Sequence, residues 1–192
     1  MTKKLFLIAG EIGSGKSLTG KAIARLTNSA IFDKDEVCKA FTETMLYVSG
    51  YDKMDRECDF YLDTVLPLEY KTMMLAALDN LAVNDNSVVC IAPFVNQLQD
   101  ESWIHSLLVG LKELQTDLYV VWVNTDIETL RLRLITRAAP KDSVKIANWN
   151  TYSEKVLTSP PKTPLSVTTL DNTTSAPEPL TTQINELLRL IH

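Results

Sequence analysis

Eight residues near the start of the chain, 10–17, read Gly-Glu-Ile-Gly-Ser-Gly-Lys-Ser and directly follow the apolar run 5–9. Glycines let the backbone curl until successive N–H groups point inward, and a helix that starts there brings its positive N-terminus to the same place. A lysine and a hydroxyl at the end of such a loop suit the phosphates of a nucleoside triphosphate and Mg²⁺. The spacing GxxxxGKS therefore predicts a phosphate-binding loop, or P-loop.

Each residue of this loop has an expected role. We expect Lys16 to reach the β- and γ-phosphates and Ser17 to supply its hydroxyl to Mg²⁺, while Gly13 and Gly15 adopt positive φ angles. The loop residues expected to bind the nucleotide are Gly10, Gly13, Ser14, Gly15, Lys16 and Ser17. A chance glycine turn is the alternative. Apolar residues at helical spacing over 18–26 favour nucleotide binding instead.

Two carboxylates follow the second apolar run, in the segment Phe32-Asp33-Lys34-Asp35-Glu36. An acceptor hydroxyl would need a base at such a strand end, and Mg²⁺ would use an outer ligand there. We predict Asp35 to be the base. For Asp33 two roles stay open: a contact to the metal, or the N-cap of a helix with Glu36 at its third position.

Three arginines lie on a helix that is predicted to begin near Asp126 and to break at Pro140. Arg133 and Arg137 share one face through their i, i+4 spacing. A pair of this kind can clamp the γ-phosphate as charge develops, and a mobile segment can carry it in. We predict Arg137 and Arg133 as phosphate ligands and give Arg131 a weaker claim, because a solvated basic face is the usual fate of helical arginines.

The apolar run 88–92 stands where many P-loop enzymes carry a strand that ends in an acidic Mg²⁺ ligand. Here Pro93 and Phe94 follow it, and neither Asp nor Glu does. Either Asp33 or Asp35 takes over the magnesium contact through water, or the metal is held mainly by Ser17 and the nucleotide. The second arrangement suits phosphate transfer better than vigorous hydrolysis.

The whole chain has 192 residues, 45% hydrophobic content and a formal net charge of −5. Such a chain buries one substantial core, and its acidic balance argues against a general nucleic-acid or membrane-surface binder and for a small-molecule partner. Three cysteines without metal-like spacing indicate reduced thiols and a cytoplasmic protein. No apolar run approaches the roughly 18 residues of a membrane span.

Helical patterns separate the apolar runs, which is typical of an α/β fold with a parallel sheet whose ligands bind after the strands. The runs expected to form strands are 5–9, 30–32, 88–92, 118–123 and 165–170. We expect a single domain over 1–192, with a helical insertion at about 36–84 and a lid at about 131–150. Within the insertion, breaks are predicted near Gly50 and Pro67.

The P-loop, the turn 32–36 and the helix from Arg133 to Arg137 that leads to Lys141-Asp142 and Lys145 together resemble the small P-loop kinases. That branch includes chloramphenicol phosphotransferase, gluconate kinase, zeta-toxin kinases and the kinase domain of polynucleotide kinase. The chain looks most like bacterial zeta-toxin-like proteins labelled AAA-family ATPases, in which similar FDKD, APF and arginine-helix segments recur. The likeness covers most of the chain, but only the P-loop is highly specific.

The resemblance implies a three-layer α/β sandwich whose five parallel strands follow the order 2-3-1-4-5, with an insertion over the acceptor and a lid that carries arginine. By similarity, Asp35 matches the aspartate that activates the acceptor, and Arg137 matches a lid arginine near the ATP phosphates. Asn172, after the last strand, falls where the branch places backbone near adenine. The substrate does not carry over, because one scaffold serves many acceptors.

The leading hypothesis is an ATP-dependent phosphotransferase that uses Mg²⁺ and moves the γ-phosphate to a hydroxyl of a small molecule, as a monomer or homodimer. The alternative is an ATP-binding regulator that changes shape with little or no hydrolysis. A motor-type AAA ATPase would need a longer chain and the missing acidic strand. A GTPase would need an Asn-Lys-x-Asp selector, which the segment Asn124-Thr125-Asp126 does not supply.

Overall fold

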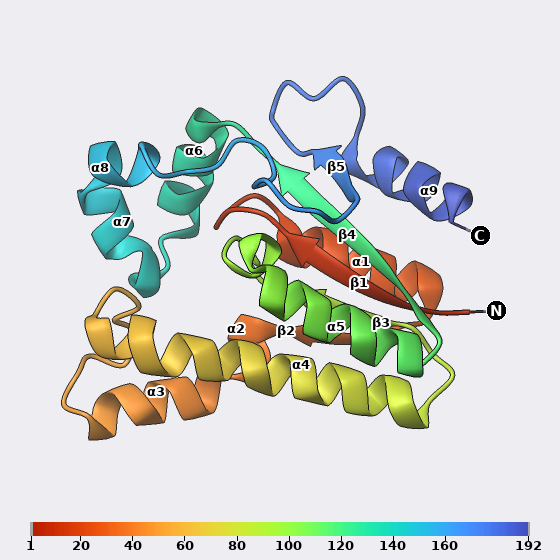
Figure 1. Cartoon of the computed structure of the whole chain (residues 1–192). Helices are drawn as coiled ribbons and strands as arrows, with labels where there is room; N and C mark the ends of the chain where they lie inside the picture. Colours follow the sequence, from red (N-terminus) through yellow and green to blue (C-terminus); the bar gives the residue numbers. More distant parts are fainter. Residues whose placement is uncertain (1, 192) are drawn as a thin grey trace.

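Five parallel strands form the centre of the molecule (Figure 1). The computed structural model describes residues 2–191 and, within that range, every side chain except that of residue 141. The strands are β1 (Lys3–Ala9), β2 (Ala30–Asp33), β3 (Val88–Ile91), β4 (Thr116–Asn124) and β5 (Val167–Asp171). Their order in the sheet is β2-β3-β1-β4-β5, which confirms the predicted fold class and strand order.

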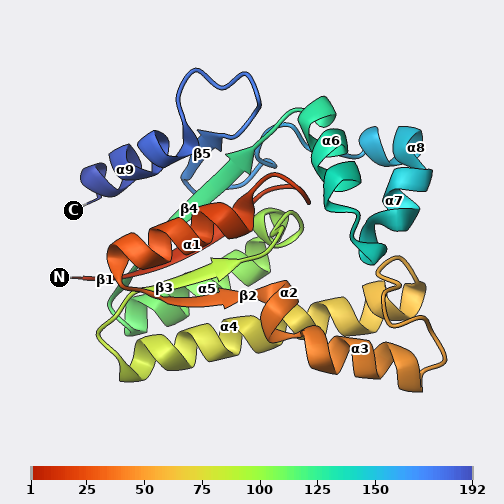
Figure 2. The same cartoon turned by 180° about the vertical axis from the view of Figure 1, so that it is seen from behind.

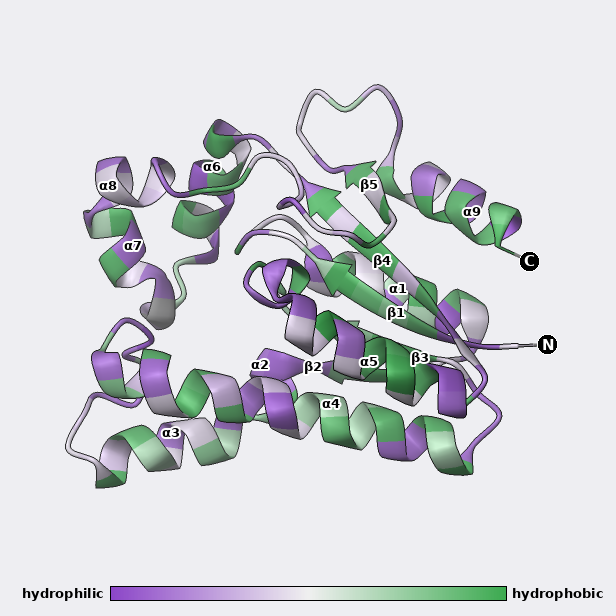
Figure 3. Cartoon of the chain, viewed as in Figure 1, coloured by the Kyte–Doolittle hydropathy of each residue, from purple (hydrophilic) through white to green (hydrophobic). Residues whose placement is uncertain are grey.

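Helices cover both faces of this sheet, as the two opposite views show (Figures 1 and 2). On one face lie α1 (Lys16–Thr27) and α9 (Leu180–Leu190), and on the other lie α4 (Leu66–Val83) and α5 (Glu101–Glu113), which follows the short turn Gln97–Gln99. Strands buried on both sides need apolar residues at every position rather than at alternate ones. In β1 this apolar run is Leu5–Ala9, after two lysines at the start of the strand, and most of β1 has the hydrophobic colour in Figure 3.

Alternate residues of β1 serve the two cores. Leu5 and Leu7 pack with α4 and α5, while Phe6 and Ile8 pack with α1 and α9, and all four are fully buried. Helix α1 lies very close to β3, because a Cβ on Gly20 would stand 2.4 Å from Cδ1 of Ile91. This tight packing fixes the helix that carries the end of the P-loop.

The chain between β2 and β3 is a helical insertion, drawn in orange and yellow in Figure 1. It consists of α2 (Lys34–Val37), α3 (Lys39–Val48), a π-helical turn (Tyr61–Val65) and α4. The break expected near Gly50 is present, since α3 ends two residues before it and Gly50 has a φ of 85°. The break expected at Pro67 is not. Pro67 is the second residue of α4, which continues directly from the π-helical turn, so the chain stays helical through it.

The helices that follow β4 form a separate group at the carboxyl ends of the strands (Figure 1). It contains α6 (Ile127–Arg137), the turn Pro140–Asp142, α7 (Ser143–Ala147) and α8 (Trp149–Ser153). Asp126 caps α6 by accepting from the N–H of Thr129 at 2.7 Å, as the sequence led us to expect for the start of this helix. Leu130 and Leu134 pack on Trp149 in a small core of their own. Across residues 2–191, no helix has the length and apolar character needed to cross a membrane.

Candidate active site

The P-loop joins β1 to α1, and its glycines hold a conformation that side chains would oppose. Gly10, Gly13 and Gly15 have φ angles of 135°, 82° and 105°, which confirms the positive φ expected at Gly13 and Gly15. A Cβ on Gly15 would stand 2.2 Å from Nδ2 of Asn172, and a Cβ on Gly10 would stand 2.6 Å from the carbonyl oxygen of Val123. The loop therefore tolerates only glycine at these two positions.

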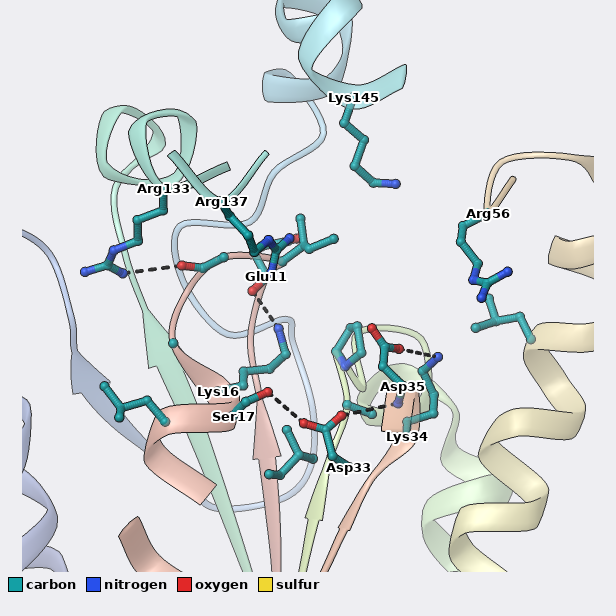
Figure 4. Close-up of a pocket in the computed structure, with 18 of the residues that line it drawn as sticks. Glu11, Lys16, Ser17, Asp33, Lys34, Asp35, Arg56, Arg133, Arg137 and Lys145 are labelled. Carbon is teal, nitrogen blue, oxygen red and sulfur yellow. Dashed lines mark hydrogen bonds and ion pairs between the residues drawn. The ribbon is translucent and has the colours of Figure 1, made fainter. Parts of the chain in front are cut away.

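Lys16 lies over the loop and points into the pocket (Figure 4). Its ammonium donates to the carbonyl oxygen of Glu11 at 2.6 Å. Burial lowers the pKa of Lys16 to about 8; Arg137 acts in the same direction, and the carboxylates of Glu11, Asp35 and Asp33 oppose it. A negative ligand in this pocket would relieve the cost of burying the charge, so the loop is suited to a phosphate.

Ser17 and Asp33 face each other across the gap between α1 and β2 (Figure 4). The Ser17 hydroxyl donates to Oδ2 of Asp33 at 2.7 Å, while Oδ1 of Asp33 accepts from the N–H of Asp35 at 3.2 Å. One oxygen of Asp33 thus caps α2, which is one of the two roles that the sequence left open. The other oxygen faces the P-loop hydroxyl, and its contact to a metal stays a prediction. Hydroxyl and carboxylate oxygens suit Mg²⁺. Among the described residues, no group of three or more His, Cys, Asp or Glu side chains is placed to hold a metal ion.

Asp35 stands on the pocket wall opposite Lys16, with its side chain 49% exposed. Its Oδ1 lies 3.0 Å from Nζ of Lys34, a lysine that is buried and forms a second ion pair with Glu69. We singled out neither Lys34 nor Glu69 from the sequence. A signal existed, because Glu69 is the lone acid in the apolar helical stretch 65–78, and a buried carboxylate needs a partner.

Arg133 holds the back of the P-loop and does not extend over Lys16 (Figure 4). Its guanidinium donates to the carbonyl oxygens of Asn172 at 2.8 Å, Ser14 at 3.3 Å and Gly13 at 3.4 Å. The side chain of Asn172 donates to the same Ser14 oxygen at 2.6 Å. The P-loop is therefore held by two elements, which are helix α6 and the loop that follows β5. Arg131 lies outside the pocket, with its guanidinium 5.8 Å from the centre of the Trp149 ring.

Arg137 lines the pocket beside Lys16, at the last position of α6. Its Nε and Nη2 donate to one oxygen of Asp142, at 3.0 and 2.5 Å. Asp142 is fully buried, and within the described part of the chain its other oxygen has no hydrogen-bond partner. The guanidinium is thus held in one orientation by a carboxylate five residues along the chain.

These residues surround one cavity of about 570 Å³ at the carboxyl ends of the strands. The P-loop and Arg137 form one side of it. The other side is lined by side chains from the insertion, the end of β3 and the short helices after α6: Asp35, Arg56, Tyr61, Leu62, Leu66, Pro93, Lys145 and Tyr152. Lys145 forms an ion pair with Glu57, so a direct contact joins α7 to the insertion at the edge of the cavity.

Comparison with known proteins gives the fold a context. No family model and no curated protein matches the sequence. Solved kinases share the fold. A structure from Chloroflexus aurantiacus J-10-fl that carries a provisional kinase assignment matches with a TM-score of 0.70 and 16% identity, over 98% of each chain.

Two further solved structures have the same arrangement of strands and helices. A gluconokinase from Sinorhizobium meliloti 1021 matches with a TM-score of 0.57 and 18% identity, over 98% of this chain and 93% of its own. The APS kinase of Mycobacterium tuberculosis, in complex with AMPPNP and APS, matches with a TM-score of 0.55 and 17% identity, over 99% and 98%. At these identities the likeness establishes the fold, and the narrower resemblance to zeta-toxin-like proteins stays a prediction.

Proposed function

We propose that this protein is an ATP-dependent phosphotransferase that moves the γ-phosphate to a hydroxyl of a small-molecule acceptor. The observation that carries the proposal is the arrangement in one cavity of a complete P-loop on one side and Asp33 and Asp35 on the other. The names of the solved structures support it, since they include a gluconokinase and an APS kinase bound to AMPPNP. The cavity, of about 570 Å³, suits a nucleotide tail and a compact acceptor.

In this proposal the P-loop N–H groups, Lys16 and Arg137 bind the β- and γ-phosphates and offset the charge that develops during transfer. Ser17 and Asp33 would hold Mg²⁺, which when bound neutralises phosphate charge. Asp35 accepts the proton of the acceptor hydroxyl as that oxygen attacks phosphorus in line with the leaving oxygen. The phosphoryl group leaves ADP and joins the acceptor, and the proton stays on Asp35 until it is released.

Arg133 and Asn172 have a supporting part in this scheme. Because both donate to P-loop carbonyl oxygens, they preform the loop before the nucleotide arrives. The resemblance to the small P-loop kinases leads us to expect adenine near the backbone of Asn172. We further expect the protein to be cytoplasmic, to prefer ATP to GTP, and to be a monomer or homodimer.

The alternative is an ATP-binding regulator without transfer chemistry. It was supported by the absence of an Asp or Glu directly after β3, where many P-loop enzymes have a Mg²⁺ ligand. The position of Asp33 weakens that support. Its Oδ2 lies 2.7 Å from the Ser17 hydroxyl, and in this proposal the neighbouring strand β2 supplies the carboxylate that β3 lacks. A carboxylate from β2 can take over the task of one from β3, because the two strands are adjacent in the sheet and end at the same edge.

The deciding experiment incubates the purified protein, Mg²⁺ and ATP labelled with ¹⁸O in the γ-phosphate with a bacterial metabolite extract, followed by mass spectrometry. A labelled phospho-product that forms with the wild type and not with Lys16→Ala establishes a kinase and names its acceptor. Asp35→Asn should abolish transfer while ATP binding persists. ADP release without product, or ATP binding without turnover, would move the assignment to the regulator.

A further inference from the structure

A buried carboxylate lies in the group of short helices that follows β4. Asp142, the last residue of the turn Pro140–Asp142, is fully buried, whereas the side chain of its partner Arg137 is 42% exposed. Both Nε and Nη2 of Arg137 donate to Oδ2 of Asp142, at 3.0 and 2.5 Å. Among the described residues, Oδ1 of Asp142 has no hydrogen-bond partner. The hydrogen bonds of this buried carboxylate thus serve a single arginine.

The backbone after α6 turns back so that Asp142 reaches Arg137. Arg137 is the last residue of α6, and Ala138, which follows it, has a φ of 47°. This left-handed conformation is uncommon for a residue with a side chain and costs free energy. Pro140 then begins the turn, and the N–H of Asp142 closes it by donating to the carbonyl oxygen of Ala139 at 2.9 Å. A short, partly strained loop therefore brings the arginine and the carboxylate together.

Stability gives little reason for this pair. Removing a carboxylate from water is costly, and its attraction to an arginine offsets only part of that cost. The buried oxygen without a partner adds to the cost. What the pair does achieve is to restrict the Arg137 side chain, since two hydrogen bonds to one oxygen remove most of the freedom of a long side chain. The role of Asp142 therefore lies in what Arg137 does.

The other end of the Arg137 guanidinium is left for a ligand. Within the described residues Nη1 forms no hydrogen bond, and the side chain lines the cavity near Lys16 (Figure 4). The pKa of Lys16 is lowered mainly by burial and also by the charge of Arg137, so the two cations act on each other. Arg137 lies one helical turn beyond Arg133, which already contacts the P-loop. Its position beyond the loop suits the outermost phosphate of a nucleotide rather than the inner ones.

We propose that Asp142 is a positioning residue that presents the Nη1 end of Arg137 to the γ-phosphate, so that the site binds a nucleoside triphosphate in preference to a diphosphate. The inference rests on the proposed function, in which Arg137 binds the phosphates. A side chain that is already ordered loses less conformational entropy when the γ-phosphate arrives. ADP lacks that phosphate and gains nothing from the positioned guanidinium, so the product is held more weakly than the substrate.

The charge of Asp142 opposes its positioning effect. A negative carboxylate beside Arg137 weakens the attraction of the site for any phosphate, and for a triphosphate more than for a diphosphate. On charge alone, Asp142→Asn would therefore raise the preference for the triphosphate. Loss of positioning would lower it. The sign of the change separates the two effects.

The test measures the Kd values of AMPPNP and of ADP, each with Mg²⁺, by calorimetric titration, and takes their ratio as the selectivity. Arg137→Gln should lower the selectivity for AMPPNP about 10-fold, because a charged hydrogen bond to the γ-phosphate is lost. The glutamine amide can still donate to Asp142, so the buried carboxylate keeps a donor. Asp142→Asn should lower the selectivity about 3-fold, which corresponds to ordering one long side chain on binding.

The double variant Arg137→Gln/Asp142→Asn isolates the positioning effect. Once Arg137 is gone, only the charge effect of Asp142→Asn remains, so the selectivity should stay at that of Arg137→Gln or rise. A fall caused by Asp142→Asn in the wild-type background alone supports the proposal. An equal fall in both backgrounds overturns it, and so does an unchanged or raised selectivity in Asp142→Asn or an unchanged selectivity in Arg137→Gln.

Asp126→Ala is the matched control, since it removes a hydrogen-bonded carboxylate from the start of the same helix without touching Arg137. Its selectivity should equal that of the wild type. A fall as large as that of Asp142→Asn would show that any loosening of α6 has this effect, and the positioning role would be refuted.

A second measurement needs no nucleotide. NMR of protein labelled with ¹⁵N at arginine, with the Arg137 Nε–H signal assigned from its loss in Arg137→Gln, follows the exchange of that proton with water. Exchange should be slow in the wild type, where the Nε–H donates to Asp142, and faster in Asp142→Asn. Equal exchange in the two proteins would contradict the positioning role. Circular dichroism verifies that each variant is folded.

Failure of this inference is separable from failure of the proposed function, because neither measurement needs an acceptor or phosphate transfer. A wild type that does not bind AMPPNP would refute the proposed function and this inference together. A wild type that binds AMPPNP normally, with unaltered selectivity in Asp142→Asn, would overturn the inference alone.

Discussion

Replacing Lys16 with methionine should stabilise the protein without nucleotide, although it removes the residue assigned to the phosphates. Burial lowers the pKa of Lys16 from 10.5 to about 8. A change of one in a pKa corresponds to about 1.4 kcal/mol, so the charged lysine disfavours the folded state by up to about 3 kcal/mol below pH 8. The variant also loses the hydrogen bond to Glu11, worth about 1 kcal/mol. Since Lys16 keeps some contact with water, we expect a net gain of about 1 to 2 kcal/mol at pH 7.

The gain must depend on pH in one direction. Between pH 8 and 10.5 the unfolded chain holds a proton on Lys16 that the folded chain has released. The stability of the wild type relative to the variant therefore rises with pH across that window. Near pH 10.5 only the lost hydrogen bond remains, and the wild type should be the more stable protein.

Urea unfolding without nucleotide, at pH values from 7 to 10.5, measures both effects. Lys21→Met is the control, because Lys21 is exposed on the same helix and its replacement should change stability little. A Lys16→Met variant that is less stable than the wild type at pH 7 would refute the reasoning. So would a difference between the two proteins that stays constant up to pH 10.5.

Three further substitutions test the parts that hold the site. Gly15→Ala puts a Cβ 2.2 Å from Nδ2 of Asn172 at a φ of 105°. Calorimetric titration should therefore show no ATP binding, and the free energy of unfolding should fall by about 2 kcal/mol. ATP affinity equal to that of the wild type would contradict the tight fit. Gly20→Ala meets Cδ1 of Ile91 at 2.4 Å and should destabilise by about 1 to 3 kcal/mol in thermal unfolding. Adding Ile91→Val should restore part of that loss, whereas simple addition of the two losses would argue against the contact. Asp126→Ala removes the cap of α6 and should cost about 1 kcal/mol at pH 7. Hydrogen bonds, the strongest from the backbone N–H of Thr129, lower the pKa of Asp126. The difference in stability between the wild type and the variant should therefore be present above pH 3.8 and vanish as the pH falls further. A difference in stability that persists in acid would contradict the capping role.

The sequence was sufficient for the sheet because fully buried parallel strands are continuous apolar runs. The run 5–9 and the run 88–92 match β1 and β3 closely. The positive φ angles of Gly13 and Gly15 could be predicted because the P-loop motif requires glycine there. The last strand was the weakest signal. It lies at the edge of the sheet and is only partly buried, so polar residues interrupt its apolar run.

The side-chain contacts of the site were harder to predict, since they depend on how elements pack. The i, i+4 spacing placed Arg133 and Arg137 on one face of a helix. It could not show that Arg133 donates to carbonyl oxygens of the P-loop or that Arg137 donates to Asp142. The pairing of Lys34 with Glu69 joins positions 35 residues apart, and it exists only because α4 lies against α2. Local pattern carries no information about such distant partners.

The buried ion pair between Lys34 and Glu69 belongs to a polar cluster that limits how this scaffold can be redesigned. Lys34, Thr42 and Tyr61, which contact Glu69 of α4, come from α2, α3 and the π-helical turn, so an insertion transplanted from another protein would have to bring all of them or none. Substitution at cavity-lining positions outside the cluster avoids that constraint. Leu62 and Leu66 line the cavity without contributing a polar contact to Glu69, which makes them the first places to vary in order to change the shape of the cavity.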